Sequence, residues 1–83
     1  MVALQLAFDA ESWAEVTDAR GERLLFGLNT AGRNVALRGE PPFAIVLGDA
    51  NAVRLTVDGA PYEIPRVGRQ GNLVRFSVDF SEE

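Results

Sequence analysis

Hydrophobic and polar residues alternate with a period of two near both ends of the chain. In residues 2–8, Leu4, Leu6 and Phe8 point one way and the residues between them point the other. Residues 73–80 repeat this pattern with four inward positions, Val74, Phe76, Val78 and Phe80. A period of two is typical of a strand with one face on a core and the other in solvent. Because no segment has the 3.6-residue period of a helix, the pattern predicts an all-β protein.

Residues 12–27 are predicted to form a β-hairpin around the turn Asp18-Ala19-Arg20-Gly21. An Asp that opens a turn and a Gly three positions later suit a type I turn closed by a left-handed glycine. In the corresponding register Asp18 pairs with Glu22.

This register places the apolar side chains of the hairpin on one face, which a half-buried sheet requires. The predicted pairs on that face are Val16 with Leu24 and Ala14 with Phe26, with Ser12 near Leu28. The other face then carries Trp13 opposite Gly27, where an indole covers the bare glycine backbone.

A second hairpin is predicted in residues 53–64 around Asp58-Gly59, a strong two-residue turn signal. Arg54 lies across from Glu63 on the wet face of this register. Pro61 cannot donate a ladder hydrogen bond, so its strand is expected at a sheet edge. The apolar pairs on the inner face are Val57 with Ala60, Leu55 with Tyr62 and Val53 with Ile64.

The remaining segments complete an antiparallel β-sandwich or a small barrel of about seven to eight short strands. Residues 39–42, which end in two prolines, break the chain, and the apolar run 43–47 is predicted to be a central strand covered on both faces. We expect one domain over residues 2–80 and a frayed acidic tail over residues 81–83.

The composition excludes several classes of function but does not identify one. The 83-residue chain has a formal net charge of −4, and its eight basic residues are all arginines scattered along the sequence. A nucleic-acid partner is therefore not expected, because binding to phosphates requires clustered basic residues. The chain has no cysteine, which excludes disulfides, and no apolar stretch long enough to span a bilayer. It resembles a domain cut from a longer protein.

The sequence lacks most of the residue types and motifs that catalytic sites use. The sequence has no His, Cys or Lys, and neither Ser12 nor Ser77 lies in a nucleophile motif. The carboxylates Asp9 and Glu11, and Asp49 near Asn51, could form a catalytic or cation-binding pair, but such residues more often form solvated turns. We predict no enzyme activity, no catalytic residue, no metal and no cofactor.

Trp13 is the residue with a functional alternative. It could stack on a sugar or a peptide, or it could pack on Gly27 and Leu25 and shield that face of the sheet, which we favour. Arg66 and Arg69, in a long loop, could contact an acidic surface or remain solvated. Trp13, Leu25, Arg66 and Arg69 are thus the candidate binding surface, and addition of an extended partner strand at a sheet edge is a further possibility.

Several turn and strand residues together carry a family resemblance. In chain order they are Trp13-x-Glu15-x-x-Asp18-Ala19-x-Gly21-x-x-Leu24-x-x-Gly27, then Pro42-Phe43-x-Ile45-Val46-Leu47-Gly48-x-Ala50, then Val53-x-Leu55 with Gly59, and Gly71-Asn72-Leu73-Val74-Arg75-Phe76. They resemble the C-terminal domain of the bacterial RodZ cytoskeletal proteins, a domain of unknown function. The similarity runs from Leu4 to about Val78.

The resemblance implies the periplasmic part of a bitopic inner-membrane protein. Such proteins have a cytoplasmic helix-turn-helix domain that contacts the actin-like MreB, one membrane span and a linker, and they help to maintain rod shape. The expected function is a non-catalytic interaction module whose partners belong to the cell-wall elongation or division machinery. The alternative is a carbohydrate- or peptidoglycan-binding module that uses Trp13 as its stacking platform. The family motif offers no catalytic or ligand-binding residue to transfer.

Overall fold

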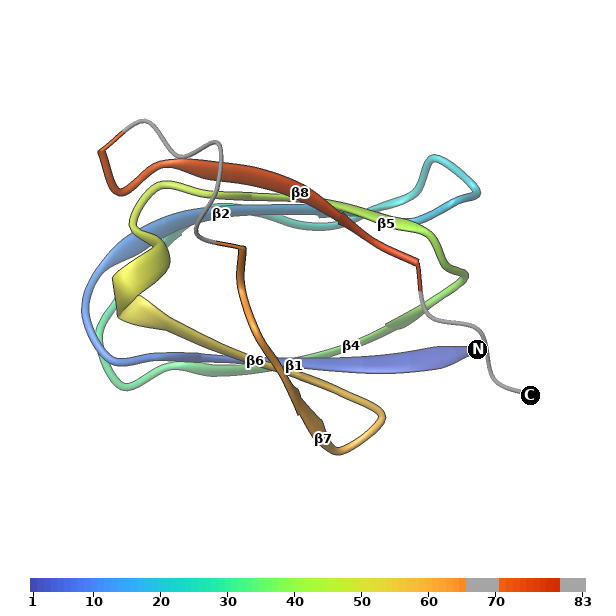
Figure 1. The fold of residues 1–83 in the computed structure, drawn as a ribbon, viewed down its shortest axis with the longest axis horizontal. Coiled ribbons are helices and arrows are strands. Elements are labelled where there is room, and N and C mark those ends of the chain that lie inside the picture. The colour runs from blue at the N-terminus through green and yellow to red at the C-terminus, as the bar shows by residue number, and fades with distance from the viewer. Residues whose placement is uncertain (66–70, 80–83) are drawn as a thin grey trace.

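Two four-stranded antiparallel sheets pack face to face in the computed structural model, which describes residues 1–65 and 71–79 (Figure 1). One sheet has the strand order β4-β1-β6-β7 and the other β3-β2-β5-β8. The predicted all-β sandwich is therefore confirmed. The elements are β1 (Val2–Phe8), β2 (Ser12–Thr17), β3 (Arg23–Asn29), β4 (Asn34–Gly39), β5 (Phe43–Leu47), the short helix η1 (Ala50–Ala52), β6 (Val53–Val57), β7 (Ala60–Tyr62) and β8 (Val74–Val78).

The core lies between the sheets and is built from alternate residues of their strands. Leu4, Leu6 and Phe8 of β1 are at most 2% exposed, as the alternation predicts. Their counterparts in the other sheet are equally buried and include Val16, Phe43, Ile45, Leu47, Val74 and Val78. At the open side of the sandwich, the rings of Tyr62 on β7 and Phe76 on β8 stack with their centroids 6.4 Å apart.

The second hairpin has the predicted turn and the predicted register as far as Tyr62. Asp58 and Gly59 both have positive φ, 49° and 83°, as a type I′ turn requires. Leu55 pairs with Tyr62, and Pro61 lies in the edge strand β7. The pairs are confirmed as Val57 with Ala60 and Leu55 with Tyr62.

The predicted pairs beyond Tyr62 are wrong because β7 ends there. Val53 therefore has no ladder partner in Ile64, although Ile64 is still buried at 9% exposure. Arg54 does not pair with Glu63. It instead binds the carboxylate of Asp9, which follows β1, with N–O distances of 2.9 and 3.0 Å.

The turn of the opening hairpin is also as predicted. The Gly21 N–H donates to the Asp18 carbonyl at 2.9 Å, and the Asp18 N–H donates to the Glu22 carbonyl at 3.0 Å. Gly21 has a φ of 81°, so the left-handed glycine is confirmed.

The strand register beyond this turn differs from the prediction by one residue. A β-bulge lies between the pairs Thr17–Arg23 and Val16–Leu25, so that Leu24 is an additional residue in β3. Leu24 and Leu25 both pack against the core. Every later residue of β3 is shifted, and the pairs are Glu15 with Phe26, Ala14 with Gly27, Trp13 with Leu28 and Ser12 with Asn29.

Strand β5 is central in its sheet, between β2 and β8, as the apolar run predicts. Its outer face is not covered, however, because Ala44 is exposed and Val46 only half-buried. Small and β-branched side chains on the solvent face explain why the run reads as apolar on both sides. The predictions for Phe80, for the loop arginines and for residues 81–83 lie outside the described residues.

Candidate binding surfaces

The bulge in β3 places Phe26 and Leu28 beside Trp13 of β2, on the outer face of the β3-β2-β5-β8 sheet. Trp13 is 38% exposed, Phe26 50% and Leu28 57%, and we call these three residues the aromatic patch. Leu28 pairs directly with Trp13 across the strands. Among the described residues, the one other exposed large hydrophobic side chain is Met1. The apolar exposure of this surface is therefore concentrated in one place, which is typical of a binding surface.

The two rings of the aromatic patch are held in a defined arrangement. The centroids of Trp13 and Phe26 lie 5.1 Å apart and their planes are 80° apart, an edge-to-face contact. The Trp13 indole Nε1–H donates to Glu15 Oε2 at 2.8 Å. The Arg23 guanidinium lies 4.3 Å from the centre of the Phe26 ring. Nearly perpendicular rings do not present one flat platform, so the patch is a ridged apolar surface with a cation beside it.

A glycine does lie next to Trp13, but it is Gly48 and not Gly27. The Gly48 N–H, at the end of β5, donates to the Trp13 carbonyl at 2.8 Å. A Cβ at Gly48 would lie 3.1 Å from the Trp13 Cβ, a tight contact that glycine avoids where the two strands meet. The strand pairs with β5 on one side and β3 on the other thus fix the position of the indole.

The sequence-derived site residues do not form one surface. Leu25 pairs with Val16 and packs against the core, so it lies on the opposite face of β3 from the aromatic patch. Arg66 and Arg69 lie outside the described residues. Sequence reasoning missed Phe26 and Leu28, because both were assigned to the core in the unbulged register.

The turn of the opening hairpin is held by Asp18, whose side chain is fully buried. Asp18 Oδ2 accepts from Arg20 Nε at 2.7 Å and from the Glu40 N–H at 3.2 Å, and Oδ1 accepts from the Arg20 and Glu22 N–H groups. Burial alone would raise the pKa of Asp18, but these hydrogen bonds together hold it below its ordinary value. The contact to Glu40 ties the turn to the segment before β5, so the role of Asp18 is structural.

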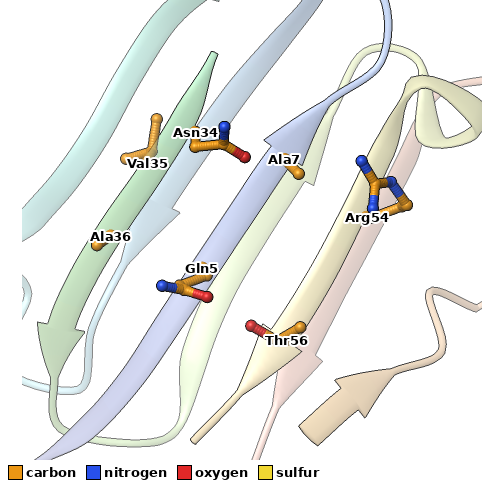
Figure 2. A pocket seen from close by; sticks show the side chains of 7 residues that line it. All are labelled: Gln5, Ala7, Asn34, Val35, Ala36, Arg54 and Thr56. Atoms are coloured by element: carbon orange, nitrogen blue, oxygen red, sulfur yellow. The ribbon is translucent and has the colours of Figure 1, made fainter. Parts of the chain in front are cut away.

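The second candidate surface is a hollow on the outer face of the other sheet, across β4, β1 and β6 (Figure 2). Its volume is about 320 Å³, and its polar lining consists of Gln5, Asn34, Arg54 and Thr56. The hydrogen bond from Arg54 lowers the pKa of Asp9, and the same bond raises the pKa of Arg54. These residues come from three strands that are distant in sequence, so no motif indicates them.

The model of the RodZ C-terminal domain family matches residues 5–77 of the chain. The chain belongs to the RodZ C-terminal domain family. No solved structure matches it. The matched range of this RodZ domain contains both the aromatic patch and the hollow on the opposite sheet.

Neither surface of this RodZ domain combines the groups of a common catalytic site. In residues 1–65 and 71–79, no three His, Cys, Asp or Glu side chains gather in a way that could hold a metal ion. No helix in this part of the chain is long and apolar enough to cross a membrane.

Proposed function

We propose that this RodZ C-terminal domain is a non-catalytic, periplasmic protein-interaction module of a RodZ-like protein. In this proposal the parent protein couples the MreB cytoskeleton to cell-wall elongation and rod shape. The domain engages proteins of the elongation or division machinery outside the membrane. The observation that carries the proposal is the aromatic patch, and the family membership supports the identity of the parent protein.

The chemistry of the aromatic patch is that of a protein interface. Tryptophan, phenylalanine and arginine are enriched at such interfaces, and tryptophan and arginine dominate their energetic centres. Trp13 and Phe26 are fixed by each other, by Glu15 and by Arg23, so little side-chain entropy is lost when a partner covers them. A patch that is already ordered needs no rearrangement to bind.

Strand addition at the neighbouring edge of β3 is less favoured than docking on the patch. The bulge at Leu24 interrupts the regular edge of the strand. The side chains of the outer face are therefore the preferred contact surface.

The structure also bears on the alternative in which Trp13 stacks on a sugar. A stacking platform needs an open ring face, whereas the Trp13 and Phe26 rings meet nearly at right angles and Arg23 covers part of Phe26. The indole N–H, a usual donor to a sugar hydroxyl, is already bound to Glu15. The geometry of the aromatic patch therefore favours a protein partner.

Site-specific photo-crosslinking in rod-shaped cells tests this proposal on the full-length parent protein. The crosslinking amino acid replaces Phe26 or Leu28 and, as a matched control, Glu63, which is exposed at the far edge of the other sheet. We expect adducts with identified wall-elongation or division proteins from positions 26 and 28 and not from position 63. Equal yields at all three positions, or no adduct at 26 and 28 with efficient labelling, would contradict the proposal.

A further inference from the structure

The outer face of the β4-β1-β6-β7 sheet has a trough that follows β1. The outward side chains of β1 are Ala3, Gln5 and Ala7, two of which are too small to fill the space above the strand. Figure 2 shows Gln5 and Ala7 on β1 between the side chains of β4 and those of β6. A further hollow of about 380 Å³ shares Gln5 and Ala36 with the first and continues past Ala3. The trough therefore runs along most of β1, a shape suited to a chain-like ligand.

The trough offers uncharged hydrogen-bonding groups that have no partner within the described residues. Gln5 and Asn34 each present an amide with both donors and an acceptor, and neither side chain has a hydrogen bond in this part of the protein. The Thr56 hydroxyl is buried and also lacks a partner there. Gln5 pairs with Thr56 across the strands, and Figure 2 shows its amide turned toward that hydroxyl. A buried unpaired hydroxyl is uncommon in proteins, and it makes the floor of the trough beside Gln5 polar.

The charges at the two ends of the trough are balanced. Arg54 is paired with Asp9 in a two-pronged contact at one end. At the other end Arg38 and Asp58 both line the continuing hollow, and Asp58 accepts from the Ala3 N–H at 2.8 Å. A trough with one acid and one base at each end has no preference for an anion or a cation. It favours a neutral ligand.

The position of β1 argues against an extended peptide as that ligand. Peptides that bind sheets in an extended conformation usually add to an edge strand through backbone hydrogen bonds. Strand β1 is paired with β4 on one side and β6 on the other, so its backbone groups are already used. Recognition above β1 must come from the side-chain amides of Gln5 and Asn34 and the apolar surface of Ala7 and Ala36. Those groups match the hydroxyls and the C–H faces of sugar rings.

From this combination we propose that the trough binds an uncharged saccharide chain. The site lies on the sheet opposite the aromatic patch, so it is separate from the proposed protein-binding surface. Its open shape and the absence of an aromatic side chain among its lining residues imply weak binding, with a dissociation constant on the order of millimolar.

A titration of the isotope-labelled chain with a neutral chito-oligosaccharide, followed by nuclear magnetic resonance, tests the site. We expect the side-chain amide signals of Gln5 and Asn34 and the backbone signals of β1, β4 and β6 to shift. Ala36→Phe fills the trough at an exposed position and should abolish these shifts. Ala44→Phe is the matched control, because Ala44 is also an exposed strand alanine, on the outer face of the other sheet.

Other variants keep the test decisive if Ala36→Phe fails to fold. Gln5→Ala and Asn34→Ala each remove one neutral hydrogen bond and should weaken binding by about two- to tenfold. No shift at the highest soluble sugar concentration, or shifts centred on Trp13, would overturn the proposal. An alanine-rich peptide of similar length that moves the same signals at lower concentration would also overturn it.

Discussion

The contact between Trp13 and Phe26 can be measured with a double-mutant cycle of Trp13→Ala, Phe26→Ala and the double variant. The contact exists because the bulge at Leu24 turns Phe26 to the outer face. In an unbulged hairpin the two rings would lie on opposite faces and would not touch. The coupling energy of the pair therefore tests the register of the opening hairpin as well as the structure of the aromatic patch.

The expected magnitudes follow from the exposure of each ring. Trp13 is 38% exposed, so its truncation should cost about 2–3 kcal/mol, roughly three-fifths of the loss for a core Trp. Phe26 is 50% exposed, and its truncation should cost about 1.5–2.5 kcal/mol, half of the loss for a core Phe. Each single variant loses the edge-to-face contact, and the double variant loses it only once. The double variant should therefore be less destabilised than the sum by about 0.5–1.5 kcal/mol.

Urea unfolding of the four proteins provides these free energies, with far-ultraviolet circular dichroism as the signal because Trp13 is the sole tryptophan. Trp13 paired with Tyr62 is the control cycle, since Tyr62 lies in the opposite sheet and stacks on Phe76. The control losses should add within about 0.5 kcal/mol. If the Trp13–Phe26 losses are additive to about 0.3 kcal/mol, the rings are not in contact and the bulge is misplaced.

Three further predictions concern the turn and the patch. Gly21→Val should lower the free energy of unfolding in urea by about 1–3 kcal/mol, because Gly21 has a φ of 81°, which is strained for valine. No atom lies within 4 Å of the added Cβ, so the loss would come from backbone strain alone, and an unchanged free energy would contradict the assigned turn. The pKa of Asp18 is lower in the folded protein than its ordinary value of 3.8, so its contribution to stability is complete above that value and is lost as the pH falls through the folded pKa. Asp18→Asn should therefore flatten the acid limb of thermal stability measured against pH, and an unchanged limb would exclude this role. Leu28→Ser, at a side chain that is 57% exposed, should change the free energy of unfolding by less than about 1 kcal/mol but should reduce crosslinking from position 26; unchanged crosslinking would remove Leu28 from the interface.

Local signals were sufficient to predict the fold class and both turns. In β1 the large apolar residues occupy every second position and not the positions between, so Leu4, Leu6 and Phe8 can be assigned to the core directly. Asp58-Gly59 requires positive φ at both residues, and few sequences other than Asn-Gly or Asp-Gly tolerate that. These features depend on neighbouring residues alone, and the sequence contains all of them.

The register of β3 could not be predicted, because both its odd-numbered and its even-numbered positions carry apolar side chains. Arg23 is followed by Leu24, Leu25 and Phe26, so sliding the strand by one position exchanges one apolar set for another. In the observed register Asn29 pairs with Ser12, and both polar side chains are buried and hydrogen-bonded. Asn29 accepts a hydrogen bond from Arg33, and the Ser12 hydroxyl accepts one from the Asp49 N–H. The contact between Ser12 and Asp49 joins segments 37 residues apart, which a local sequence pattern does not indicate.

The trough could not be predicted from the sequence for a different reason. Gln5, Asn34 and Thr56 each lie on the solvent face of a regular strand, where a polar residue needs no explanation. They become a set only when β1 pairs with β4 on one side and β6 on the other.

The two outer faces of the sandwich have different chemistry, and the bulge at Leu24 accounts for the difference. On the β4-β1-β6-β7 sheet the regular alternation leaves alanines, amides and hydroxyls outside. On the other sheet one additional residue in β3 sends Leu25 to the core and Phe26 and Leu28 to the solvent. The same register holds Phe26 between Trp13 and Arg23, so the difference between the two faces comes from one additional residue and not from a difference in composition.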